Sequence, residues 1–172
     1  MMDGVLVVVS GLPGSGKSAL ADALGQRLGA PVLSVDPIEA AIWRSGISPS
    51  FETGVAAYEV AAVLAERHLR LGLTAIADAV NSLEVARRMW RRAANRTGSP
   101  MRVIEVICSD IDVHRKRLAN RARNIDGFPE PSWEQVLARR DEWEDWADDS
   151  LMLDTVQPLA VNVERAVNHL MP

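Results

Sequence analysis

The chain has 172 residues, of which 48% are hydrophobic and 24% charged, so we expect a globular protein with a single domain over residues 1–172. The formal net charge of −4 argues against a general nucleic-acid-binding or membrane-surface protein, and no apolar stretch approaches the roughly 20 residues that span a bilayer. The single cysteine and the lack of a signal-peptide pattern predict a cytoplasmic protein.

Apolar runs alternate with amphipathic segments along the chain. The runs predict strands at residues 5–10, 32–35, 73–78, 101–108 and 151–154. The amphipathic segments predict helices at residues 16–28, 36–45, 53–71, 82–96, 110–123, 132–146 and 158–170. This alternation favours an α/β fold, in which a parallel five-stranded sheet has helices on both faces. Ligands of such sheets bind beyond the carboxyl ends of the strands.

Two helix starts carry recognisable capping signals. Asp36 precedes Pro37, so we expect Asp36 to cap the second helix, with Glu39 in the capping-box position. Ser132 and Gln135 predict a capping box at the start of the sixth helix. In the helix at 82–96, the spacing of the apolar residues predicts that the arginines point outward.

The segment GLPGSGKS, residues 11–18, lies between a predicted strand and a predicted helix and satisfies the pattern G-x-x-x-x-G-K-[ST] of a phosphate-binding loop. Its glycines permit backbone conformations that turn N–H groups toward a phosphate, and the helix start adds its positive end. Lys17 supplies a cation for the terminal phosphates and Ser18 a hydroxyl for Mg²⁺. The nucleotide is therefore expected to contact Gly11, Pro13, Gly14, Ser15, Gly16, Lys17, Ser18 and Ala19.

Carboxylates follow the second and third predicted strands. Asp78 ends the third strand, where a nucleoside-triphosphatase holds Mg²⁺, although an Asp in a polar turn is the simpler alternative. Asp36 follows the second strand and is a candidate general base for an acceptor hydroxyl. Asp36 is also a natural helix cap, and the two roles are compatible.

Four segments together resemble the P-loop kinase-like proteins described as "AAA domain, ATP-binding", whose relatives include polynucleotide 5′-hydroxyl kinases, gluconate-type kinases, chloramphenicol phosphotransferase and zeta-type toxins. These segments span most of residues 4–135 and read SGLPGSGKS, SVDPIEAAIW, IADAVNSLEVARRMW and VHRKRLANRARN. The resemblance implies a three-layer sandwich with a short lid at about residues 117–132. It also implies an ATP- and Mg²⁺-dependent phosphotransferase.

The resemblance also assigns roles to single residues. Asp36 matches the family's general base, and Asp78 matches its strand-three carboxylate. Asn81 matches a polar residue that faces the site. Three arginines match lid residues that lie against the transferred phosphate, with Arg123 favoured because it stands at the predicted junction of helix and loop; they are Arg117, Arg121 and Arg123.

Several features bear on the acceptor. The polynucleotide kinases of this family usually place two acids after strand two, whereas this chain has Asp36 followed by Pro37, which weakens a nucleic-acid acceptor. Trp43 lies on the helix after Asp36, where an acceptor should bind, although packing against the sheet explains it equally well. Arg44 is a candidate for holding an anionic or polyol acceptor.

The sequence thus favours a kinase that uses ATP and Mg²⁺ to phosphorylate a hydroxyl of a small molecule such as a sugar, nucleoside or antibiotic. A 5′-hydroxyl polynucleotide kinase is the first alternative, and a nucleotide-dependent regulatory ATPase without an acceptor is the second. The sequence leaves open the acceptor, the preference for adenine or guanine, and the oligomeric state.

Overall fold

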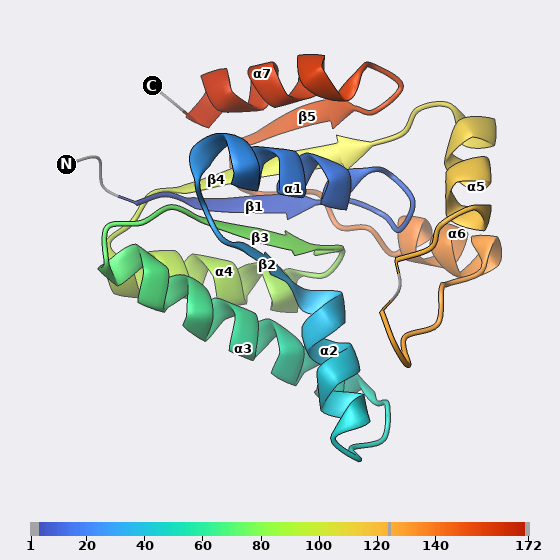
Figure 1. Ribbon diagram of the computed structural model, residues 1–172, viewed down its shortest axis with the longest axis horizontal. Coiled ribbons are helices and arrows are strands. Elements are labelled where there is room, and N and C mark those ends of the chain that lie inside the picture. The colour runs from blue at the N-terminus through green and yellow to red at the C-terminus, as the bar shows by residue number, and fades with distance from the viewer. Residues whose placement is uncertain (1–3, 124, 171–172) are drawn as a thin grey trace.

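Five parallel strands form the central layer of the protein. The computed structural model describes residues 4–123 and 125–170. Its strands are β1 (Leu6–Ser10), β2 (Val32–Ser34), β3 (Ala75–Ala79), β4 (Met101–Ile107) and β5 (Ser150–Asp154). They lie in the order β2-β3-β1-β4-β5, and every neighbouring pair is parallel, so all carboxyl ends meet at one edge (Figure 1).

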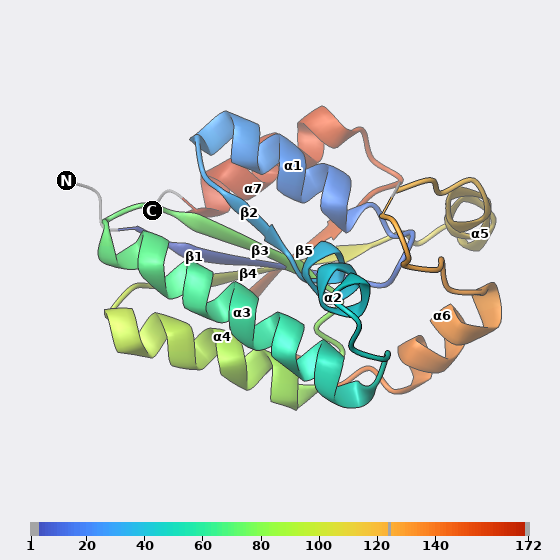
Figure 2. The same ribbon diagram turned by 60° about the horizontal axis from the view of Figure 1, so that its bottom comes forward.

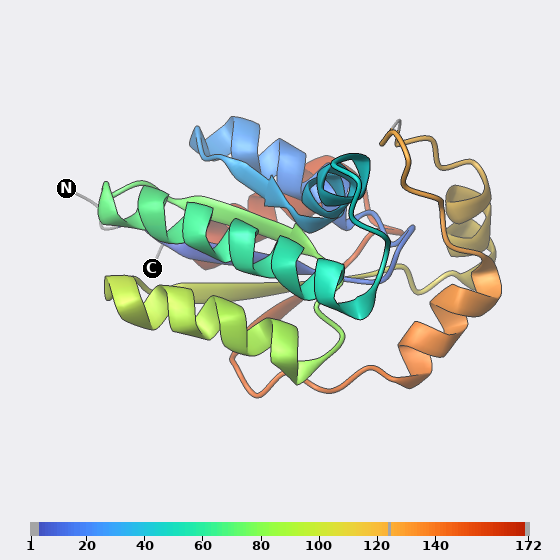
Figure 3. The ribbon, with the colours of Figure 1, turned by 90° about the horizontal axis from the view of Figure 1, so that it is seen from below.

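Helices cover both faces of this sheet, which confirms the predicted α/β sandwich. α1 (Lys17–Leu28) and α7 (Leu159–Leu170) lie on one face, and α3 (Phe51–Arg70) and α4 (Glu84–Thr97) lie side by side on the other (Figures 1 and 3). The remaining helices lie beyond the carboxyl ends of the strands (Figure 2); they are α2 (Val35–Arg44), α5 (Ile111–Ala119) and α6 (Trp133–Asp141). No helix in the described part of the chain has the length and apolar character needed to cross a membrane.

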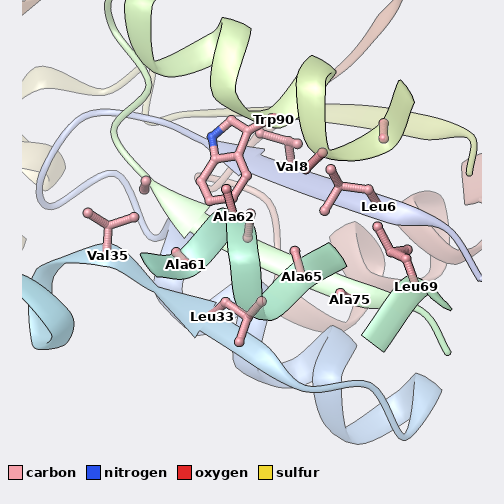
Figure 4. Close-up of a cluster of buried hydrophobic side chains, with 14 of the residues drawn as sticks. Leu6, Val8, Leu33, Val35, Ala61, Ala62, Ala65, Leu69, Ala75 and Trp90 are labelled. Carbon is pink, nitrogen blue, oxygen red and sulfur yellow. The ribbon is translucent and has the colours of Figure 1, made fainter. Parts of the chain in front are cut away.

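Side chains of β1 pack in two separate hydrophobic cores, because successive side chains of a strand point to opposite faces of the sheet. Leu6 and Val8 pack in the core under α3 and α4, whereas Val7 and Val9 pack in the core under α1 and α7. α3 turns a row of alanines to the sheet (Figure 4), namely Ala57, Ala61, Ala62 and Ala65. These small side chains allow α3 to approach the sheet closely and leave room for the fully buried ring of Trp90.

Several helix boundaries differ from the predicted ones, and three of these differences affect the residues near the site. The helix predicted at 110–123 ends at Ala119, so Arg121 and Arg123 lie in the lid loop that joins α5 to α6. The second helix begins at Val35 and not at Pro37, so Ser34 stands at the cap position and Asp36 lies within the first turn. The capping box of Ser132 and Gln135 is confirmed. The sixth helix ends at Asp141, five residues before the predicted end.

Buried Arg87 accounts for the early end of α6 and contradicts the prediction that the α4 arginines point outward. Its side chain is fully buried and donates to the backbone carbonyl oxygens of Asn81 (2.9 Å) and Asp145 (2.7 Å). The guanidinium carbon also lies 4.4 Å from the ring centre of Trp146 and 5.7 Å from that of Trp143. Arg87 therefore holds the segment after α6 in a non-helical path, a contact between distant residues that helical periodicity does not reveal.

We expect Arg87→Met to destabilise the protein by about 2–4 kcal/mol, because it leaves the buried carbonyl group of Asn81 and the partly buried one of Asp145 without this donor. The adjacent Arg88 is exposed, so Arg88→Met is the matched control and should change stability by no more than about 0.5 kcal/mol. Urea unfolding followed by tryptophan fluorescence measures both values. Equal stability of the two variants would contradict the clamping role of Arg87.

Candidate functional site

The loop of residues 11–18 forms a phosphate-sized cradle at the start of α1. Gly14 and Gly16 have positive φ angles of 81° and 97°, which side-chain-bearing residues rarely adopt. A Cβ on Gly14 would lie 3.2 Å from His114 Cδ2, and one on Gly16 would lie 3.0 Å from a Thr155 methyl carbon. His114 Nε2 lies 2.8 Å from the carbonyl oxygen of Pro13, and Thr155 Oγ1 donates to the carbonyl oxygen of Ser15 (2.6 Å). The loop is thus held from outside by α5 and by the turn after β5.

The cradle opens into a pocket of about 210 Å³, which is called the phosphate pocket below. Most of the predicted nucleotide contacts line it, together with two lid-side arginines; the lining residues are Gly14, Gly16, Lys17, Ser18, Ala19, Arg117 and Arg121. Gly11, Pro13 and Ser15 are buried and do not line this pocket, and Pro13 instead lines the largest of the three cavities described here. A Cβ on Gly11 would lie only 2.5 Å from the carbonyl oxygen of Val106. Arg117 is positioned by donating to Thr155 Oγ1 (2.7 Å) and to its carbonyl oxygen (2.9 Å).

Lys17 is the buried cation of this pocket, with only 3% of its surface exposed. The pKa of Lys17 is lowered, because the effect of burial exceeds the opposing effect of the nearby Asp78 and Asp36 carboxylates. A bound polyphosphate would supply the negative charge that favours the protonated amine. The position therefore suits binding of an anion.

Ser18 and Asp78 meet in a second pocket of about 180 Å³ that adjoins the first. Asp78 is 6% exposed, its Oδ2 accepts from the Ser34 hydroxyl (2.9 Å), and its buried Oδ1 has no partner among the described residues. Asp22 lines the same pocket, where burial first and Asp78 second raise the pKa of Asp22. An unpaired carboxylate oxygen beside a hydroxyl and a phosphate cradle fits Mg²⁺, which combines few protein ligands with phosphate oxygens and water.

The described residues contain no group of three metal-ligating His, Cys, Asp or Glu side chains. A Mg²⁺ ion at this place would therefore depend on the nucleotide for part of its coordination, as is common for the metal of phosphoryl-transfer sites.

We expect Asp78→Asn to raise the Mg²⁺ concentration needed for half-maximal tightening of nucleotide binding by roughly tenfold or more. The reason is that an amide oxygen carries no charge to hold the ion. Titrating Mg²⁺ against binding of a fluorescent ATP analogue measures the effect, with Asp141→Asn on the exposed end of α6 as control. An unchanged Mg²⁺ dependence in Asp78→Asn would exclude Asp78 as a ligand.

Asp36 also lines the pocket of Ser18 and Asp78, which is called the metal pocket below because of these candidate ligands. Asp36 lines a third, larger cavity as well. Its Oδ2 forms an ion pair with Arg123 of the lid, whose Nε donates in turn to Glu130 (2.8 Å). Glu130 also accepts from Arg121 (3.2 Å). The lid is thus tied to α2 by one chain of alternating charges.

Arg121 and Arg123 occupy different places in this arrangement. Arg121 lines both the phosphate pocket and the large cavity, whereas Arg123 lines the metal pocket and the large cavity. Burial, and then the charge of Arg123, lower the pKa of Arg121. Arg121 thus shares the phosphate pocket with Arg117, whereas Arg123 is the partner of Asp36.

The large cavity, of about 510 Å³, lies between α2, α3, α4 and the lid. Trp43 lines it, and its ring stacks on Phe128 of the lid with ring centres 4.8 Å apart. The side chains of Tyr58, Val85 and Met89 line the opposite walls. Burial raises the pKa of Tyr58, so its hydroxyl stays protonated.

Glu39 is a cavity residue whose predicted role was different. The sequence predicts a capping-box acid, but α2 has no side-chain cap hydrogen bond. Glu39 instead lines the cavity and accepts from the Thr53 hydroxyl (3.0 Å). Asp36, Glu39 and Trp43 are spaced i, i+3 and i+7, which places them on one face of α2. That spacing is visible in the sequence and is the signal that could have identified Glu39.

Asn81 and Arg44 lie apart from the cavity lining. Asn81 is fully buried with a left-handed backbone (φ 56°), its Oδ1 accepts from Trp90 Nε1 (2.8 Å), and its Nδ2 donates to the carbonyl oxygen of Ala79 (3.2 Å). The expected substrate contact of Asn81 is therefore wrong, because both ends of its amide are already paired inside the protein. Exposed Arg44 donates to the carbonyl oxygen of Asp126 (2.9 Å) and so contacts the outside of the lid.

Comparison with solved structures places these pockets in a known fold. A sugar kinase from Janibacter sp. aligns with a TM-score of 0.73 at 20% identity, covering 97% of this chain and 94% of the other. The APS kinase CysC of Mycobacterium tuberculosis, solved with AMPPNP and APS, aligns with a TM-score of 0.73 at 18% identity over 100% of both chains. A gluconokinase from Sinorhizobium meliloti gives 0.66 at 19% identity, covering 98% and 92%.

At these identities the likeness shows the fold alone, which is that of P-loop kinases. A search of the curated proteins found no match. A protein-family model described as "AAA domain" matches residues 6–143, which include the cradle, Asp36, Asp78 and the lid arginines. The chain therefore belongs to this AAA domain family of P-loop kinase-like proteins.

Proposed function

We propose that the protein is a kinase that uses ATP and Mg²⁺ to phosphorylate a hydroxyl group of a small molecule. One observation carries the proposal. The large cavity shares Arg121 with the phosphate pocket and shares Asp36 and Arg123 with the metal pocket, so an acceptor in the cavity would face the terminal phosphate. A site that only hydrolyses or senses a nucleotide has no need of a second cavity at this position.

In this proposal, different residues bind the nucleotide, hold the metal ion and activate the acceptor. Backbone N–H groups of the cradle and Lys17 hold the triphosphate, while Ser18 and Asp78 would hold Mg²⁺, which when bound neutralises phosphate charge. Asp36 orients the acceptor hydroxyl and takes its proton as the oxygen attacks the terminal phosphorus. The bond from that phosphorus to the bridging oxygen breaks, and ADP leaves.

The ion pair between Asp36 and Arg123 fits this sequence of events. A terminal phosphate brought into the site competes for the guanidinium groups of the lid, because phosphate oxygens accept the same paired donors as a carboxylate. The release of Asp36 from Arg123 would then free a carboxylate oxygen for the acceptor hydroxyl. Closure of the lid also excludes water and so favours transfer over hydrolysis.

Transfer of label from [γ-³²P]ATP tests the proposal. The protein is incubated with ATP, Mg²⁺ and a panel of sugars, nucleosides, hydroxylated antibiotics and a 5′-hydroxyl oligonucleotide, and the products are separated by thin-layer chromatography. We expect label on a small-molecule acceptor and none in the Lys17→Met variant. Label on the oligonucleotide alone would make the protein a polynucleotide kinase. Steady ATP hydrolysis with no labelled acceptor would favour a regulatory ATPase.

A further inference from the structure

The walls of the large cavity are mainly carbon. Aromatic and aliphatic side chains from α2, α3, α4 and the lid line it, including Trp43, Val55, Tyr58, Val85, Met89 and Phe128. The rings of Trp43 and Phe128 stack 9° from parallel where α2 meets the lid, and both residues line the cavity. Its volume of about 510 Å³ is in the range of pockets that enclose drug-sized molecules.

The charged groups of the cavity are largely engaged with one another. Asp36, Arg123, Glu130 and Arg121 form the chain of ion pairs that links α2 to the lid. A polyol in this cavity would place most of its hydroxyl groups against carbon atoms, where each lost hydrogen bond to water goes uncompensated. The lining therefore disfavours a sugar acid or an open-chain polyol and suits a molecule with an apolar ring.

Glu39 and Arg139 are the charged lining residues outside this chain of ion pairs. The Oε1 of Glu39 is held by the hydroxyl of Thr53, which is 4% exposed and itself accepts from Trp43 Nε1 (3.0 Å) and from the Ser50 backbone N–H (3.0 Å). No donor among the described residues bonds the second oxygen, Oε2, and no cation lies within ion-pair distance of the carboxylate in this part of the chain. Glu39 is thus a fixed, half-buried acceptor one helical turn from Asp36.

Resting on the proposed kinase function, we infer that the acceptor is a ring-bearing, mostly apolar alcohol with a second hydrogen-bond donor, a hydroxyl or amine, that Glu39 binds. The ring packs against the stacked Trp43 and Phe128, Glu39 holds the donor, and the reacting hydroxyl lies at Asp36. The separation of Asp36 and Glu39 by one turn of α2 sets the spacing between the reacting hydroxyl and the second donor. Glu39 is in this scheme a specificity-determining residue and takes no part in the proton transfer.

A matched series of acceptors tests the inference by [γ-³²P]ATP transfer. Phenylalaninol carries a ring, an amine and a primary hydroxyl, 3-phenylpropan-1-ol lacks the amine, and 2-aminopropan-1-ol lacks the ring. We expect kcat/KM to fall by roughly tenfold when the amine is removed and by more when the ring is removed, since a lost apolar contact alone costs about 10- to 200-fold. Gluconate, the polyol of the series, should be the poorest acceptor.

The outcomes separate this inference from the proposed function. Preference for gluconate or for 2-aminopropan-1-ol over phenylalaninol would overturn the inference and leave the kinase intact. Hydrolysis of ATP with no label on any compound, including the small molecules of the wider panel, would overturn the kinase and the inference together.

Two pairs of variants test the two contacts separately. Val85→Phe fills the cavity and should lower kcat/KM for phenylalaninol by at least roughly tenfold, whereas Val63→Phe, on the exposed face of α3, should not change it. Glu39→Gln should abolish the preference for phenylalaninol over 3-phenylpropan-1-ol, as measured by the ratio of their kcat/KM values. Glu164→Gln is the control, because Glu164 is an exposed residue of α7. A Glu39→Gln variant that keeps its preference for the amine would overturn the role of Glu39, and normal ATP affinity in each variant shows that the fold is intact.

Discussion

Asp36→Asn is expected to lower kcat for phosphotransfer by roughly 10²- to 10⁴-fold, the range of a lost general base, and to leave ATP affinity nearly unchanged. The amide keeps the size of the side chain and can still orient a hydroxyl, but it does not accept the proton. Asp36 lines the large cavity and the metal pocket, and it does not line the pocket at the phosphate cradle, so the proposed nucleotide contacts remain. Single-turnover transfer of label measures the chemical step, and isothermal titration with an ATP analogue measures binding.

The control for this experiment is Asp141→Asn, which removes the same charge from an exposed position at the end of α6. Loss of ATP binding in parallel with loss of transfer would show that Asp36 supports the cradle and would count against a base. Full transfer activity in Asp36→Asn would remove Asp36 from the chemistry altogether.

Arg121→Ala is expected to lower kcat by roughly 10³-fold, the lower end of the effect of an arginine that stabilises charge on a transferred phosphoryl group. Arg121 lines both the phosphate pocket and the large cavity, whereas Arg123 is held by Asp36 and Glu130. Arg123→Ala should therefore cost less than Arg121→Ala, although the sequence favours Arg123 for this role. Arg121→Lys should restore little activity, because an ammonium group lacks the paired donors of the guanidinium.

Arg140→Ala, on the exposed surface of α6, is the control for the loss of one positive charge. The decisive measurement is kcat for all four variants at saturating ATP and acceptor. A larger loss in Arg123→Ala than in Arg121→Ala would return the role at the phosphate to Arg123 and make Arg121 a residue of the acceptor cavity.

The sequence by itself determined the layers of the fold and the phosphate cradle. The buried run of β1, the loop with Gly14 and Gly16, and the alternation of strands and helices are local patterns, and local backbone preferences suffice to read them. Asp36 and Asp78 follow from the same logic, since parallel strands bring their carboxyl ends together.

Only the tertiary structure decided how the lid and the cavity are built. Local periodicity continues the fifth helix to Arg123, but the helix ends at Ala119, and Arg121 and Arg123 turn toward Glu130 and Asp36. Contacts of this kind join residues up to 87 positions apart in the chain, and no local pattern records them.

The same reason explains Arg87 and Asn81. Both belong to a polar sequence that is typical of exposed helix and loop, yet both are fully buried because backbone carbonyls and aromatic rings from distant segments close around them. The energy of a buried polar group depends on the partners that surround it, and these are known only once the chain has folded. The sequence thus identifies the phosphate-binding loop motif, whereas the folded structure determines which side chains line the large cavity.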